Sequence, residues 1–116
     1  MLAAILLAVG IAILPPSEER TVSMVVQRYN LTVEQTALLK AIRRAENGRS
    51  AVAWGVADRR CRGYYKQCCW AANTIKLRYN GDLQEFSKRW CPLNDKVWYN
   101  NVLYFMRRQG VEPKRR

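Results

Sequence analysis

The chain offers few side chains for acid–base chemistry, because it has no histidine and only nine Asp and Glu among its 116 residues. Nucleophilic catalysis by a Ser–His or Cys–His pair is therefore excluded, and so is a histidine-ligated metal site. Any proton transfer must use a carboxylate, Tyr, Lys or Cys side chain. We accordingly expect no metal and no cofactor, and a carboxylate in an unusual position is the first candidate for catalysis.

Glu46 is the carboxylate in such a position. It lies four residues after Ile42 and seven after Leu39, so it shares the apolar face of a predicted helix. Burial without a partner disfavours its charge, and so does the negative end of the helix dipole. Both effects favour the protonated form that a general acid requires. The alternative is a helix-end carboxylate paired with a nearby arginine, for which the candidates are Arg43, Arg49 and Arg59.

The element that positions Glu46 is a helix predicted over 33–46. Thr32 caps its first turn and forms a capping box with Gln35, and the helix stops at Asn47-Gly48. Strand signals are scarce, so the predicted fold class is all-α. The segment 49–63 lacks a helical period and is expected to form a long irregular loop or a short hairpin. Three further helices are expected at 64–79, 83–90 and 94–109.

The ends of the chain differ from this domain in composition. Residues 2–14 form an unbroken apolar run that stops at Pro15-Pro16, and as a helix they would span about 20 Å of a hydrocarbon core about 30 Å thick. We predict a signal or membrane-anchor segment at 1–16, a domain at 17–110 and a basic tail at 111–116. Residues 17–20 are interpreted as a linker or the start of a short amphipathic helix. The protein is expected to be membrane-associated or exported, facing the periplasm or cell wall.

The net charge of +11 predicts a polyanionic partner. Nucleic acid, anionic lipid and the acidic bacterial cell wall all satisfy this criterion, and composition does not separate them. No nucleic-acid motif is present, so specific nucleic-acid binding is not expected. We expect a monomer.

Four cysteines, at positions 61, 68, 69 and 91, suggest disulfides if the domain lies outside the cytoplasm. Adjacent helical residues point about 100° apart, so Cys68 and Cys69 suit different partners. We predict one bridge from this pair to Cys61 and another to Cys91. A zinc site, for which the spacing is unsuitable, and free thiols are the alternatives.

Several short motifs resemble the lysozyme-like lytic transglycosylases and phage muramidases. The sequence from Ala41 to Gly48 is similar to the end of their catalytic helix, and Trp54-Gly55-Val56 stands where they have an apolar, glycine-containing turn. Phe86 to Pro92, Asn94-Asp95 and Trp98 to Val102 resemble the late helical segment of phage and bacterial glucosaminidase-like domains. The resemblance covers residues 36 to 105. It departs from the pattern at Ala57-Asp58, where Met-Gln is usual.

The resemblance implies a small lysozyme-like domain in which Glu46 is the catalytic acid and the partner is the glycan strand of peptidoglycan. In lytic transglycosylases one Glu protonates the leaving oxygen and then deprotonates the 6-hydroxyl, which closes a 1,6-anhydro ring. A hydrolase normally needs a second carboxylate, for which Asp58 is the candidate. An ion pair of Asp58 with Arg59, Arg60 or Arg62 would favour the single-Glu route.

A glycan cleft would present aromatic rings to sugar faces and amides to N-acetyl groups. Trp70 is a further candidate for such a lining, although it and Trp98 are more typical of a core. The predicted substrate-binding residues are Asn47, Trp54, Gly55, Val56, Asp58, Tyr64, Tyr65 and Asn73.

Two other classes of function fit the same composition. One is a basic, membrane-tethered binding protein for nucleic acid or anionic envelope polymers, which would not be an enzyme. The other is a structural virion component with a lysozyme-like fold and no activity. A phage virion or a lysis system is a further expected location of the protein.

Overall fold

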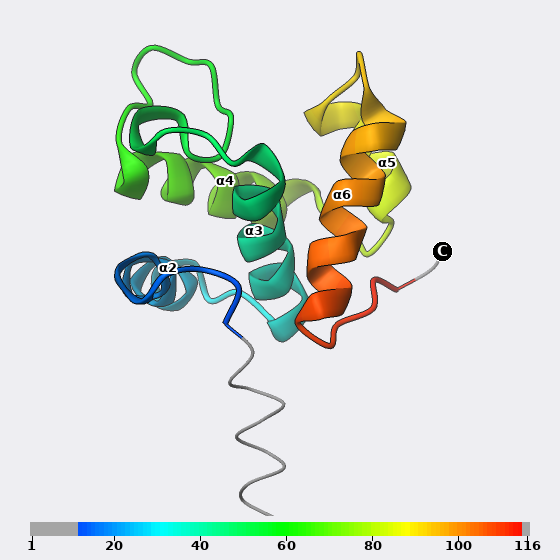
Figure 1. Ribbon diagram of the computed structural model, residues 1–116, viewed down its shortest axis with the longest axis horizontal. Helices are drawn as coiled ribbons and strands as arrows, with labels where there is room; N and C mark the ends of the chain where they lie inside the picture. Colours follow the sequence, from blue (N-terminus) through cyan, green and yellow to red (C-terminus); the bar gives the residue numbers. More distant parts are fainter. Residues whose placement is uncertain (1–11, 115–116) are drawn as a thin grey trace, which may run out of the picture.

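The computed structural model describes residues 12–114. Within them the chain forms five α-helices, one short 3-10 helix and no strand (Figure 1). The prediction of an all-α fold is therefore confirmed. The elements are α2 (Pro16–Tyr29), α3 (Val33–Glu46), η1 (Ser50–Val52), α4 (Tyr64–Arg78), α5 (Leu83–Trp90) and α6 (Asp95–Arg108).

Helix α3 begins and ends where its local sequence predicts. The backbone N–H of Gln35 donates to the Thr32 hydroxyl (3.1 Å), and the backbone N–H of Thr32 donates to the Gln35 side chain (2.9 Å). These two bonds satisfy helix donors that otherwise lack partners. At the other end Asn47 takes the left-handed conformation, with φ of 47°, and stops the helix directly after Glu46.

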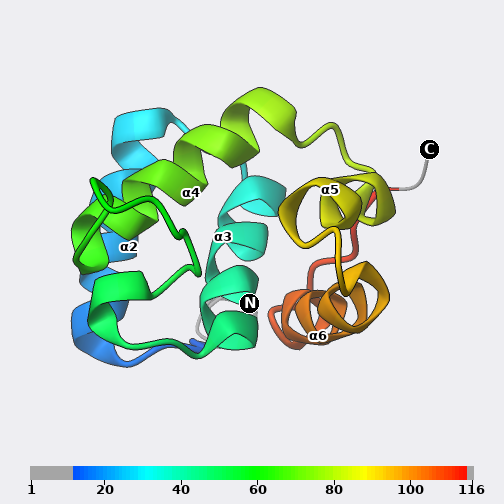
Figure 2. The ribbon, with the colours of Figure 1, turned by 90° about the horizontal axis from the view of Figure 1, so that it is seen from above.

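Helix α3 lies between two groups of elements (Figure 2). It packs against α4 on one side and α6 on the other, while α2 and η1 pack on α4 and α5 packs on α6. The C-terminal end of α3 therefore lies where the loop before α4 and the beginning of α6 come together (Figure 1). Glu46, the last residue of α3, is placed at this junction.

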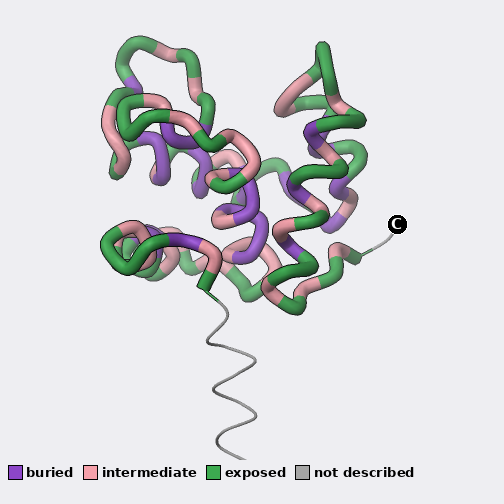
Figure 3. Tube along the Cα trace, viewed as in Figure 1, coloured by how far each residue is buried: buried purple, intermediate pink, exposed green. Residues whose placement is uncertain are grey.

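The hydrophobic core follows the inner faces of the helices around α3 (Figure 3). Leu38, Leu39 and Ile42 of α3 are completely buried. Helix α2 contributes Val22 and Val25, which are also completely buried. The apolar stripe that the sequence predicts for 33–46 is thus the surface on which the other helices pack.

Residues 17–20 belong to the 14-residue helix α2, which agrees with the second of their two interpretations, the start of a helix. Two other parts of the fold differ from the sequence predictions. Leu14 is buried in the core, so the folded part begins before the predicted boundary at residue 17. In the predicted tail, Val111 packs against the core and Glu112 pairs with Arg107 at 2.8 Å.

The long segment before α4 is an irregular loop that contains η1, and within residues 12–114 no hairpin forms. The predicted apolar anchor falls mainly on residues 1–11, which lie outside the described part of the chain. In the described part, no helix combines the length and the apolar composition needed to cross a bilayer.

All four cysteines are free thiols in the structure, so the two predicted bridges are absent from it. Cys68 faces the core and is completely buried, and Cys61 is also buried, with its thiol 3.4 Å from the Lys66 carbonyl oxygen. Cys91 follows α5, on the side of α3 opposite to α4. This placement separates Cys91 from the other three thiols, which the spacing alone does not reveal.

Candidate active site

The carboxylate of Glu46 is held by an uncharged donor. The indole N–H of Trp98, in the first turn of α6, donates to Oε2 of Glu46 at 2.9 Å. The Glu46 side chain is partly buried, and within residues 12–114 it forms no ion pair. The alternative of a helix-end carboxylate paired with an arginine is therefore not the arrangement that the structure has.

Gly55 lies against the same carboxyl group. A Cβ atom at Gly55 would lie 2.6 Å from Oε1 and 2.7 Å from Cδ of Glu46, closer than real Cβ contacts allow. The φ of Gly55 is +76°, in the left-handed region that side chains disfavour. The backbone conformation therefore favours glycine here, and a Cβ atom would in addition displace the Glu46 carboxyl group. The predicted turn after α3 thus lies against Glu46 itself.

Gln67 holds this turn in place from α4. Its side chain is completely buried, and its Oε1 accepts the backbone N–H groups of Trp54 and Val56, each at 3.1 Å. Its Nε2 donates to the carbonyl oxygens of Val56 (3.0 Å) and Cys61 (2.6 Å). One side chain therefore binds both residues that flank Gly55 and fixes the distance of the turn from Glu46.

Arg43 fixes the beginning of the same loop. Its guanidinium donates to the carbonyl oxygens of Gly48 (2.9 Å) and Ala53 (3.3 Å), and it pairs with Glu18 of α2 at 3.1 Å. The Tyr64 hydroxyl also donates to Glu18, at 2.9 Å. Burial, followed by this bond to Glu18, raises the pKa of Tyr64 well above its usual value, so its hydroxyl stays protonated.

Two predicted binding residues belong to the interior rather than to an open surface. Trp54 is completely buried, and its indole N–H donates to the Leu39 carbonyl oxygen at 2.7 Å. Tyr64 packs on the Trp54 ring, with 4.9 Å between centroids. Both support the loop beneath Gly55, and Trp54 offers no exposed surface to a ligand.

Two other predicted binding residues lie near this loop. Asn47 is the exposed cap of α3, and Val56 is partly buried beside Gln67.

Asp58 is engaged in an ion pair at the surface. The Arg60 guanidinium donates to it at 2.8 Å and 3.0 Å, and the Arg60 backbone N–H donates at 2.8 Å. The side-chain bond from Arg60 and then the backbone bond lower the pKa of Asp58 to about 2. Asp58 is therefore ionised and bound to a cation, which is the arrangement that favours a single catalytic carboxylate.

Tyr65 and Asn73 lie in another place. They line a groove between α2 and α4 together with Trp70, and neither Glu46 nor a residue that contacts it belongs to that lining. Trp70 is 42% exposed, contrary to the expectation that it is a core residue. The residues predicted to surround one glycan are thus divided between two sites.

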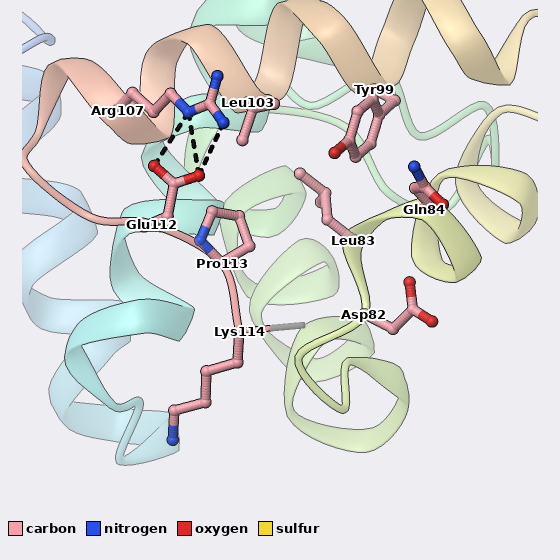
Figure 4. Close-up of a pocket in the computed structure, with 9 residues that line it drawn as sticks. All are labelled: Asp82, Leu83, Gln84, Tyr99, Leu103, Arg107, Glu112, Pro113 and Lys114. Atoms are coloured by element: carbon pink, nitrogen blue, oxygen red, sulfur yellow. Dashed lines mark hydrogen bonds and ion pairs between the residues drawn. The ribbon is translucent and has the colours of Figure 1, made fainter. Parts of the chain in front are cut away.

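A smaller hollow of about 200 Å³ lies where the C-terminal segment passes α5 and α6 (Figure 4). The ion pair of Arg107 and Glu112 forms one side of it, and Tyr99 and Gln84 lie at the other. It contains none of the predicted site residues.

Three residues that shape the site were not predicted for it. Trp98 was expected only in the core, and Arg43 was named only as a candidate ion-pair partner of Glu46, whereas it pairs with Glu18. Gln67 carried no role, although a polar residue one position before the buried stripe of Cys68, Ala71 and Ile75 is a signal for an internal hydrogen-bonding role.

No family model, curated protein or solved structure matches this chain. The proposal below is therefore founded on the contacts of these side chains.

Proposed function

We propose that this protein cleaves glycosidic bonds of peptidoglycan and that Glu46 is its general acid. The observation that carries the proposal is the environment of the Glu46 carboxyl group. It lies at the junction of the two groups of helices, with an indole N–H on Oε2 and the backbone of Gly55 against the carboxyl group, and within residues 12–114 it forms no ion pair. Proton transfer to a leaving oxygen requires a positioned carboxyl group that is not engaged in an ion pair.

The lysozyme-like character of the domain is part of this proposal. It is supported by the central helix that ends in the acid, by the glycine turn that follows it, and by the aromatic residue that contacts it from a later helix. The motifs named in the sequence fall on these same elements.

We infer a mechanism with one carboxylate, since Asp58 is occupied by Arg60. Glu46 donates its proton to the glycosidic oxygen as the bond from that oxygen to C1 breaks. The ionised Glu46 then accepts the proton of the 6-hydroxyl, whose oxygen bonds to C1 and closes a 1,6-anhydro ring. Glu46 is thereby protonated again, and no water is consumed. A hydrolase with two carboxylates would instead require a second acidic group beside the scissile bond.

The test compares the full-length wild type with Glu46→Gln on purified peptidoglycan. The wild type should release soluble muropeptides with anhydro ends, and E46Q should release them at least 1,000-fold more slowly. Glu85→Gln, an exposed position on α5, removes the same charge and should leave the rate unchanged. Equal release by wild type and E46Q, or no release by the wild type, would show that the proposal is wrong.

The second candidate is a binding protein without catalysis, which the net charge of +11 favours. In that case wild type and E46Q would bind a polyanion equally and release no fragments. A steep loss of DNA binding with increasing salt, without any muropeptide release, would identify nucleic acid as that polyanion.

A further inference from the structure

A second surface, distinct from the surroundings of Glu46, has the features of a binding site. Helices α2 and α4 lie against each other (Figures 1 and 2), and a groove of about 640 Å³ runs along them. This volume falls within the range of ordinary ligand sites, roughly 300 to 1,000 Å³. The lining consists of Arg28, Tyr29, Arg60, Cys61, Tyr65, Lys66, Cys69, Trp70, Asn73, Thr74, Leu77 and Arg78.

The groove is electropositive. Its lining includes four cationic side chains and no acidic one. Arg60 is neutralised by Asp58, and Arg28 donates to the Tyr65 hydroxyl at 2.9 Å. Lys66 and Arg78 form no side-chain hydrogen bond or ion pair with the rest of residues 12–114. Their charges are thus available to an anionic ligand.

The same groove presents aromatic and amide groups to solvent. Tyr65 and Trp70 are each 42% exposed. The indole N–H of Trp70 has no acceptor within the described residues, and Asn73 follows one turn later on α4. Exposed rings with a free donor and an amide are the groups that bind sugars, because rings pack on the C–H faces of sugars and amides bond to N-acetyl groups.

We propose that the α2–α4 groove is a second glycan-binding site, which holds a carboxylate-bearing stretch of peptidoglycan strand away from Glu46. This inference depends on the proposed function. Trp70 and Tyr65 bind sugar rings, Asn73 binds an N-acetyl group, and Lys66 and Arg78 bind lactyl or peptide carboxylates. Two exposed rings beside an amide suit a sugar chain better than a bilayer, because a sugar chain offers C–H faces and N-acetyl groups together. Insoluble substrate is thereby kept close to the enzyme between cleavages.

The binding experiment uses the full chain with Glu46→Gln, solubilised in mild detergent, and insoluble peptidoglycan freed of attached anionic polymers. Trp70→Ala should weaken co-sedimentation about tenfold, the effect expected for loss of one central aromatic contact. Lys66→Gln combined with Arg78→Gln should weaken it about fivefold or more, and this loss should decrease with added salt.

The matched control is Lys88→Gln combined with Arg89→Gln. It removes two charges from exposed positions on α5, which lies across α3 from the groove. Binding by this control should equal that of E46Q alone. Equal weakening by both double variants would indicate attraction by overall charge and would overturn the proposal, as would full binding by the groove variants. Thermal melts by circular dichroism verify that each variant is folded.

Two further experiments distinguish a remote glycan site from a part of the Glu46 site and from a lipid site. With Glu46 intact, the groove variants should cleave insoluble peptidoglycan more slowly and short soluble glycan fragments at the wild-type rate. Equal slowing on both substrates would contradict a remote site. Because the binding arm uses E46Q, it remains informative even if the wild type cleaves nothing. The groove variants are also tested on vesicles of anionic phosphatidylglycerol. If these variants lose binding to the vesicles and keep binding to peptidoglycan, the groove binds lipid and the proposal is overturned.

Discussion

The indole nitrogen of Trp98 lies 2.9 Å from Oε2 of Glu46, and this bond joins the last residue of α3 to the first turn of α6. Trp98 is itself held by rings of α5, since it stacks on Trp90 at 5.9 Å and packs near Phe86 at 6.3 Å. The orientation of the Glu46 carboxyl group therefore depends on an aromatic cluster about fifty residues away in the sequence.

Replacing Trp98 by Phe keeps an aromatic ring and removes the donor to Glu46. The bond strengthens as Glu46 gives up its proton and becomes charged, and a hydrogen bond to a charged group contributes about 1.5 to 3 kcal/mol. We therefore expect muropeptide release to slow by roughly 10- to 100-fold. Trp90→Phe is the control, because Trp90 stacks in the same cluster, and within residues 12–114 it is Trp98 and not Trp90 that donates to Glu46. If the two variants lose equal activity, the loss reflects packing and not the hydrogen bond.

Replacing Gly55 by Ala places a Cβ atom 2.6 Å from Oε1 of Glu46. We expect loss of nearly all cleavage and a decrease in the free energy of unfolding of about 1 to 3 kcal/mol. Gly110→Ala is a close control, since Gly110 also has a φ of +76° and nothing lies within 4 Å of its added Cβ. In Gly110→Ala backbone strain alone should lower the free energy of unfolding by about 1 to 2 kcal/mol, and the variant should remain active. Denaturant unfolding and muropeptide release measure the two effects.

Replacing Gln67 by Met removes the bonds that hold the turn around Gly55. Buried backbone groups of Trp54, Val56 and Cys61 lose their partner, so we expect destabilisation by about 2 to 4 kcal/mol. Gln84→Met, at an exposed position on α5, should change stability by less than about 0.5 kcal/mol. Urea unfolding provides the comparison. Equal midpoints for both variants would mean that Gln67 does not hold the loop.

The ion pair of Asp58 and Arg60 should be visible in the pH dependence of stability. Arg60 lowers the pKa of Asp58 to about 2, whereas the unfolded value is about 3.9. The pair therefore stabilises the fold above about pH 4, and this contribution is lost as the pH falls through about 2. At about pH 6 the melting temperature of the wild type should be slightly higher than that of Asp58→Asn. At about pH 2 the two melting temperatures should be equal. A difference that increases on acidification would contradict the assignment, and D58N should still release anhydro products.

The four thiols should differ in reactivity. Burial, with a smaller contribution from Cys69, raises the pKa of Cys68 far above its ordinary value, so its thiolate is scarce. Burial also raises the pKa of Cys61. With iodoacetamide at neutral pH, the partly buried Cys69 and Cys91 should be alkylated first, and Cys68 only after unfolding. Mass spectrometry of tryptic peptides gives the order, and rapid native labelling of Cys68 would contradict the burial.

The sequence alone predicted those helices whose signals are local. The capping box of Thr32 and Gln35 and the stop at Asn47 predicted α3. The helix expected at 83–90 is α5, which the Asp82 side chain caps. These signals could be read because each bond joins residues only three or four apart. Helix α2 was predicted only at its first turn. Only Val22 and Val25 of α2 are buried, so its apolar stripe is too short to be recognised in the sequence. Their burial depends on α4, which packs against α2.

The sequence also pointed to Glu46, because a carboxylate on an apolar helix face at a helix end is a local pattern. Tertiary structure alone decided what surrounds it. The bond from Trp98 to Glu46 spans 52 residues, and the bonds from Gln67 to the loop span up to 13. Tyr64 and Tyr65 are adjacent in the sequence, yet Tyr64 contacts Glu18 and Tyr65 lines the α2–α4 groove. Contacts between distant elements follow from how helices pack, and helical periodicity specifies which face is buried without specifying what it meets.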